Sequence, residues 1–197
     1  MIIAFLGESI NSYRIDFLQF LAVLTLRCPF CGSATHWHSW YARSVKGEEQ
    51  SLRILRVRCC GCAKTHAVIP DFLSPYKQYP QAVQQAVLEQ ALESGVPVEQ
   101  IEIGEDPQDE VAVTPPSVET MRYWIRSYRQ KERQCVGALV SLLERSGQHI
   151  AHWGEGFVFY RHLITCFERL FSRRLRASCL LGQVNILLTI SQLRLWI

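Results

Sequence analysis

The sequence has no apolar run that is long enough to cross a membrane. A helical span needs about 20 consecutive, mostly apolar residues. The uncharged segment 177–193 is shorter than that, and it contains the polar side chains of Gln183, Asn185, Thr189, Ser191 and Gln192. We therefore predict no membrane span and interpret this segment as a buried or dimerising helix, with association at an anionic lipid surface as the alternative.

The N-terminal residues do not predict a secretory signal. The N-terminus has apolar stretches, but no basic residue precedes the first one, and Glu8, Arg14 and Asp16 interrupt those that follow. We expect a cytoplasmic protein. Residues 15–26 are predicted to pack as a strand or a short helix that leads into the next region.

The chain lacks the residue pattern of a transposase-type nuclease. Such enzymes place spaced carboxylates on a large α/β core to hold two metal ions. The acids here cluster in predicted loops and helices, and no catalytic function is expected. Cys135, Cys166 and Cys179 lie on apolar helical segments and are predicted to be core thiols, although His162 lies four residues before Cys166 and could face it.

Two Cys-x-x-Cys pairs are the most specific feature of the chain. Cys28 and Cys31 form the first pair, Cys59 and Cys62 the second, and each has a glycine within or beside it. Two such knuckles supply the four thiolates of a tetrahedral zinc site. We therefore predict that these cysteines bind one structural Zn²⁺ ion.

Other interpretations of these cysteines remain. A pair of disulfides is one, although thiols at this spacing in the cytosol are more often metal ligands. A redox dithiol is another, but that motif has a single Cys-x-x-Cys at a strand-to-helix junction. Cys60 is interpreted as a spare thiol, and His36 and His38 as residues sharing a strand face rather than as further ligands.

The segment between the two pairs predicts a hairpin. Residues 35–45 are rich in aromatic side chains, residues 52–57 partly alternate apolar with basic side chains, and residues 46–49 supply the turn. Residues 65–69 predict a third strand that ends at Pro70 and Asp71. The prediction is a zinc ribbon, in which two knuckles hold one metal ion beside a small antiparallel sheet.

Charge is arranged in blocks along the chain. The net charge is only +3. Bases outnumber acids in residues 27–64, acids dominate residues 71–119, and the chain is basic again from Arg122. Such blocks suggest separate surfaces for separate partners.

Helices are predicted after the ribbon. Residues 70–80 form a proline-punctuated linker with aromatic anchors, residues 81–94 a helix, and residues 96–103 a short second helix. Residues 104–116 are predicted to be an exposed acidic loop. Residues 136–143 and 156–178 predict two further helices, and the second includes a basic cluster at Arg173, Arg174 and Arg176.

The helix predicted over residues 118–134 has two different faces. Ser117 is its expected N-cap. Its apolar stripe is formed by Met121, Trp124, Ile125 and Tyr128, and its basic stripe by Arg122, Arg126, Arg129 and Arg133. The four arginines are predicted to be unpaired and to contact phosphates or guanine edges. The alternative is a solvated charged face.

The chain ends on Leu195, Trp196 and Ile197 without a polar tail. This ending suggests a product that is truncated or frame-shifted relative to a longer parent. A reading frame that continues beyond the stop would support that hypothesis.

Parts of the sequence resemble an uncharacterised bacterial family of small zinc-ribbon proteins associated with insertion sequences, which is itself similar to the DNA-binding front end of transposases. The resemblance covers roughly residues 25–130 and rests on Arg27-Cys-Pro-Phe-Cys-Gly-Ser, on residues 38–43 and on residues 54–76. Its most specific parts are the two knuckles and residues 69–76 (IPDFLSPY). It implies a ribbon followed by a helix-turn-helix whose last helix, residues 117–126, enters the major groove. The acidic loop 104–116 is longer than the turn of a standard motif.

The expected fold class is α+β, with a small N-terminal antiparallel zinc ribbon and an all-helical region containing a helix-turn-helix-like unit. The expected divisions are 1–75, 76–134 and 135–197. The expected function is duplex DNA binding, transposase-associated or regulatory, through Arg122, Arg126, Arg129, Arg133, Ser117 and Thr120, helped by Arg53, Arg56 and Arg58. The C-terminal helices are expected to hold a second copy or a separate catalytic chain. The alternative is an adaptor whose ribbon and C-terminal helices bind protein partners.

Overall fold

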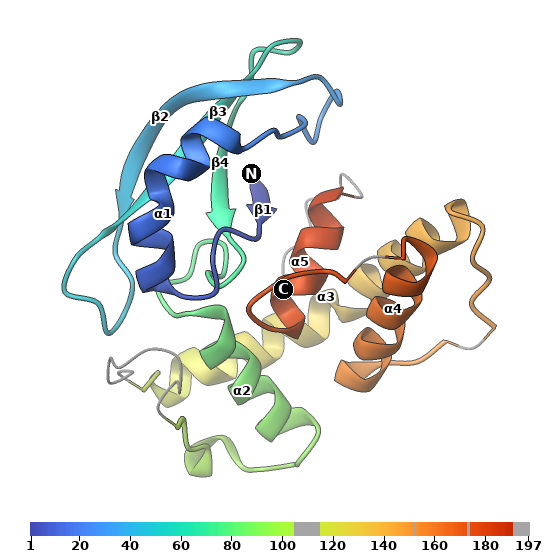
Figure 1. Cartoon of the computed structure of the whole chain (residues 1–197). Coiled ribbons are helices and arrows are strands. Elements are labelled where there is room, and N and C mark those ends of the chain that lie inside the picture. The colour runs from blue at the N-terminus through green and yellow to red at the C-terminus, as the bar shows by residue number, and fades with distance from the viewer. Residues whose placement is uncertain (105–114, 152, 173, 191–197) are drawn as a thin grey trace.

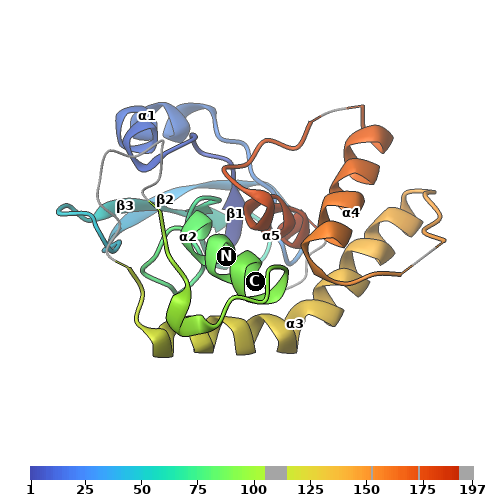
Figure 2. The same ribbon diagram turned by 90° about the horizontal axis from the view of Figure 1, so that it is seen from below.

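A four-stranded sheet and a set of helices make up this α+β protein. The computed structural model describes residues 1–104, 115–151, 153–172 and 174–190. Within them it contains five α-helices and one short 3₁₀ helix. Figure 2 shows the arrangement in layers, with α1 above the sheet, α2 and α5 below it, and α3 outermost.

The sheet has the strand order β1-β4-β3-β2. The predicted hairpin is present as β2 (Thr35–Arg43) and β3 (Leu52–Cys59), and the third predicted strand as β4 (Thr65–Pro70), all antiparallel. The sequence does not predict β1 (Ile2–Ala4), which pairs parallel with β4, so the sheet is mixed rather than antiparallel. Three residues are too few to show a strand periodicity in the sequence.

Helix α1 (Ile10–Val23) covers one face of the sheet (Figure 1). Residues 15–26 were predicted to form a strand or a short helix. The structure has a helix there, and it begins at Ile10, five residues before the expected start. Ser9 and Ser12 form a reciprocal capping box that fixes this start. Tyr13 is buried and donates a hydrogen bond of 2.6 Å to the carbonyl of Arg53, which ties α1 to β3.

The first half of the predicted linker, residues 70–75, is buried. Asp71, Leu73 and Ser74 are 0% exposed, and Phe72 packs in the sheet core. Beyond it lies α2 (Gln81–Leu92), as predicted. Only one turn of 3₁₀ helix, η1 (Val98–Gln100), forms where a second helix was expected. The acidic residues 105–114 lie outside the described part of the chain.

Helix α3 is a single element, Val118–Arg145, and it forms one edge of the molecule in Figure 2. The prediction of separate helices over 118–134 and 136–143 was wrong, because no proline or cap residue interrupts the sequence between them. The predicted cap is present, since the Ser117 hydroxyl accepts from the Thr120 N–H. The predicted apolar stripe is buried against α2 and the helices that follow.

Helices α4 (Gly156–Leu170) and α5 (Leu180–Ile190) complete the fold. In the described part of the uncharged segment, residues 181–189 are buried or half-buried within the chain, in line with the prediction of a buried helix. Leu181, Val184, Leu187 and Leu188 join the helical core, whereas Ile186 joins the sheet core. None of the described helices has both the length and the apolar character of a membrane span.

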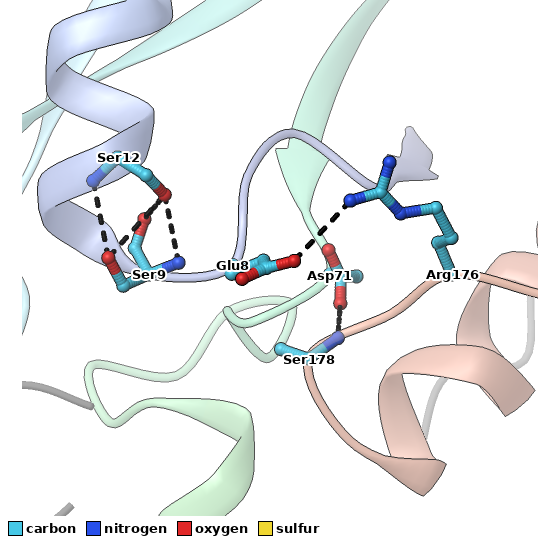
Figure 3. A network of polar contacts seen from close by, with 6 residues as sticks. All are labelled: Glu8, Ser9, Ser12, Asp71, Arg176 and Ser178. Atoms are coloured by element: carbon cyan, nitrogen blue, oxygen red, sulfur yellow. Dashed lines mark hydrogen bonds and ion pairs between the residues drawn. The ribbon is translucent and has the colours of Figure 1, made fainter. Parts of the chain in front are cut away.

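A polar contact fixes α5 to the end of β4. The Asp71 carboxylate accepts a hydrogen bond of 2.5 Å from the Ser178 N–H just before α5, and Glu8 pairs with Arg176 nearby at 3.4 Å (Figure 3). The other carboxylate oxygen of Asp71 is buried without a hydrogen-bond partner among the described residues. Burial raises the pKa of Asp71 to about 6, despite the hydrogen bond from Ser178.

Candidate metal centre and basic surfaces

Four cysteine thiols converge at one end of the sheet. The sulfur atoms of Cys28, Cys31, Cys59 and Cys62 all lie within 4.8 Å of one another. Cys28 and Cys59 are buried, Cys62 is half-buried and Cys31 is exposed. The structure therefore brings together the four predicted ligands, which are positioned to hold a metal ion.

The two knuckles repeat the same backbone geometry. The Cys28 N–H donates to the Ser33 carbonyl, and the Cys59 N–H donates to the Lys64 carbonyl, both at 2.9 Å. Each knuckle then passes through the left-handed region, at Gly32 with φ of 69° and at Ala63 with φ of 57°. Glycine adopts this conformation without strain, whereas alanine does not.

Hydrogen-bond donors surround the sulfur atoms. The N–H groups of Gly61 and Cys62 lie 3.3 Å from the Cys59 sulfur, and the Phe30 N–H lies 3.4 Å from the Cys28 sulfur. The buried His66 places Nε2 at 3.3 Å from Cys28. Sequence reasoning missed His66. Its place on the strand directly after the second knuckle was the available signal.

The thiols compete for protons in this arrangement. Hydrogen bonds from Ser33 lower the pKa of Cys31 to about 6. A backbone hydrogen bond from Lys64 acts the same way on Cys62, but burial and the neighbouring thiols outweigh it and raise the pKa of Cys62 to about 11. Four thiolates this close would repel one another, so the fully ionised cluster is the form that a bound cation would stabilise.

The remaining cysteines and histidines lie apart from the cluster. Cys60 is exposed, as one interpretation required, and its sulfur lies 3.5 Å from Nδ1 of His36. Cys135 and Cys166 are buried core thiols, and Cys179 is half-buried. His162 does approach Cys166, at 3.7 Å, on helix α4. Burial raises the pKa of Cys135 to about 12, which keeps that thiol protonated.

The basic stripe of α3 is exposed but not wholly unpaired. Arg122 forms an ion pair with Glu99 of η1, and Arg133 pairs with Glu155 at 3.4 Å. The prediction that all four arginines lack partners was therefore wrong for these two, because both acids lie far away in sequence. Arg126 and Arg129 have no ion-pair partner among the residues that the structure describes.

A groove runs beside the middle of this stripe. Its volume is about 550 Å³, and Arg122, Arg126 and Arg129 line one side while Val96, Pro97 and Val98 line the other. Ser117 and Thr120 lie at the start of α3, where the Ser117 hydroxyl is used in the cap. The groove therefore has a cationic wall with an apolar wall facing it.

The three predicted ribbon arginines project from β3. Arg53, Arg56 and Arg58 are exposed, and the strand residues between them are buried. The guanidinium of Arg53 lies 5.2 Å from the ring centre of Trp40, and that of Arg56 lies 6.0 Å from Tyr41. Arg58 donates to the carbonyl of Ala63 and so braces the second knuckle.

A comparison with protein families gives one match. Residues 28–106 match a family described as a domain of unknown function (DUF6431). The matched range includes the four cysteines, β2 to β4 and α2, and ends before α3. No curated protein and no solved structure matches the chain.

Proposed function

We propose that this protein binds duplex DNA through α3 and that a Zn²⁺ ion on Cys28, Cys31, Cys59 and Cys62 stabilises the sheet end as a zinc ribbon. The observation that carries the proposal is the exposed arginine stripe of α3, in which Arg126 and Arg129 have no acidic partner among the described residues. Unpaired guanidinium groups in a row along one helix suit phosphates and guanine edges.

Zinc is proposed for the cysteine cluster because of its donor set. Four thiolates close a tetrahedral site without an open position, which is the arrangement of structural rather than catalytic zinc. The hydrogen bonds from backbone N–H groups and the close approach of His66 would stabilise the negative charge on the sulfurs.

In the proposed DNA complex, α2 and α3 act as a helix-turn-helix-like unit. α2 and α3 pack together through Val83, Val87, Met121 and Trp124. The arginine stripe lies on a neighbouring, exposed face of α3, beside residues 96–98. Arg126 and Arg129 would enter the major groove of the DNA, while Ser117 and Thr120 at the helix start would lie near its phosphates. Arg53, Arg56 and Arg58 would add phosphate contacts from β3. A role in transposition or in regulation is the context that we propose for this binding.

The test is a salt-dependent titration of duplex DNA with the Arg126→Ala variant. Each neutralised phosphate contributes about 0.9 to the slope of log affinity against log salt concentration, so the variant should bind more weakly with a slope lower by about one. Arg145→Ala is the matched control, because Arg145 is an exposed arginine at the other end of α3 that donates to its own helix. It should leave binding and slope nearly unchanged.

Two results would contradict the proposal. One is wild-type protein with bound zinc and native circular dichroism but no affinity for duplex DNA. The other is an equal loss of binding in both arginine variants. Either result would favour the adaptor function instead. Because α5 is covered within the chain, the protein partner would have to bind another surface.

A further inference from the structure

Two tryptophans on the outer strand of the sheet are exposed. Trp37 is 54% exposed and Trp40 is 49% exposed, although large apolar side chains elsewhere in the sheet are mostly buried. β2 is also an edge strand, so one side of it pairs with no other strand. Neighbouring exposed aromatic side chains of this kind mark interaction sites.

A β-bulge places both tryptophans on the same face. Residues three apart on a regular strand point to opposite faces. Here Trp37 pairs with Val57 and Trp40 pairs with Leu55, because the register shifts between Trp37 and Ser39. Val57 and Leu55 are two residues apart on β3 and share a face, so their partners share it too.

Arg53 belongs to the same face. It pairs with Ala42 in the register of β2 and β3, and its guanidinium lies 5.2 Å from the ring centre of Trp40. Arg53 has no ion-pair partner among the described residues. The segments of β2, β3 and β4 contain no aspartate or glutamate, so the strands have only basic or neutral side chains.

We propose that the exposed sheet edge formed by Trp37 and Trp40 of β2, together with Arg53 of β3, binds single-stranded nucleic acid. Leu55 and Val57 on the same face are buried, so the contact is confined to this edge. Unpaired bases would stack on the two indole rings, and Arg53 would neutralise a neighbouring phosphate. A duplex does not offer this contact, since its base faces are stacked inside the helix. The inference rests on the proposed function in taking nucleic acid as the ligand, but it uses a surface other than α3.

Protein is the other class of partner that tryptophan and arginine attract. Two features favour nucleic acid. The surrounding strands lack acids, and the exposed Arg56 and Arg58, although they lie on the opposite face of β3 from Arg53, add to the positive charge of the sheet. A polyanion is attracted by this summed charge, whereas the balanced charge of an ordinary protein surface is not.

The test compares binding of a labelled oligothymidine with binding of a duplex of the same length by the full chain. Trp37→Ala and Trp40→Ala should each weaken single-strand binding roughly tenfold and leave duplex binding unchanged. Trp40→Phe, which retains a ring for stacking, should lose less. Trp153→Ala removes a tryptophan that is 65% exposed outside the sheet, and it should change neither affinity. Native circular dichroism and metal content establish that each variant is folded.

Each outcome bears on one surface. The inference is overturned if single-strand binding survives both tryptophan-to-alanine changes. It is also overturned if the wild type does not bind single strands, and a protein partner then becomes the explanation for this face. Arg126→Ala should reduce duplex binding while single-strand binding persists. Duplex binding without single-strand binding would leave the proposed function intact. Single-strand binding without duplex binding would reject the proposed function and support the inference.

Discussion

The two halves of this molecule are stabilised in different ways. The helical half buries large side chains in two clusters, one with Tyr128, Phe157 and Tyr160 and a smaller one with Trp124. The knuckle end of the sheet buries few apolar side chains. Residues around the second knuckle, among them Cys60, Gly61 and Ala63, are exposed. We expect that a metal ion held by the four cysteines would take the place of a core at the knuckles, while the helical half has a core of its own.

Removing one metal ligand should produce the largest difference in stability between the knuckle end of the sheet and the helical half. We expect Cys59→Ala to lose the metal and to unfold the knuckle end of β2 and β3, while the helical core persists. Structural zinc contributes on the order of 10 kcal/mol to small zinc domains, so this is the largest effect expected. Elemental analysis and hydrogen exchange of the sheet would measure it. Cys60→Ala is the control and should retain the metal. Protection of the sheet that survives metal loss would refute this account.

A smaller effect is expected where the halves meet. Asp71 accepts a hydrogen bond from the Ser178 N–H just before α5 and is 0% exposed, and its pKa is raised to about 6 from an ordinary value of 3.8. The folded state therefore binds a proton more tightly than the unfolded chain. The resulting stabilisation is fully present below the unfolded pKa and is lost as the pH rises through about 6.

Asp71→Asn should remove this pH dependence. The amide oxygen can still accept from the Ser178 N–H, so the variant should gain about 2 to 3 kcal/mol over wild type at pH above about 7 and much less near pH 4. Urea unfolding across that range, with wild type beside the variant, would measure the difference. Asp71→Ala removes the acceptor and should destabilise the protein relative to Asp71→Asn at every pH. A stability difference between Asp71→Asn and wild type that stays constant with pH would argue against an ionised, buried Asp71.

The smallest effect concerns the two knuckles themselves. Ala63 occupies the left-handed position that glycine occupies in the first knuckle. Ala63→Gly should relieve strain and raise the free energy of unfolding by about 0.5 to 1 kcal/mol, less than the full penalty because glycine also gains entropy in the unfolded chain. Thermal unfolding of the metal-loaded protein would measure it. Ala34→Gly, at an exposed position outside the left-handed region, should not stabilise, and equal gains in both variants would count against the strain.

The sequence by itself determined the features that depend on short-range patterns. The spacing of Cys28, Cys31, Cys59 and Cys62 was enough to predict a cluster, because two knuckles need only a few residues each to orient their thiols. β2, β3, β4 and α2 follow from periodicity and turn residues, and the start of α3 follows from Ser117. Those signals lie within a few residues of one another along the chain.

Only the tertiary structure decided the features that depend on contacts between distant segments. β1 exists as a strand because β4 is beside it, and the second half of α3 is buried because α4 and α5 pack against it. Glu99 and Glu155 reach Arg122 and Arg133 only in the folded chain.

The shared face of Trp37 and Trp40 likewise belongs to the tertiary structure. It requires the register between β2 and β3, which a single strand does not contain. Pairing and burial are set by the whole chain, whereas chelating knuckles and helix caps are set locally.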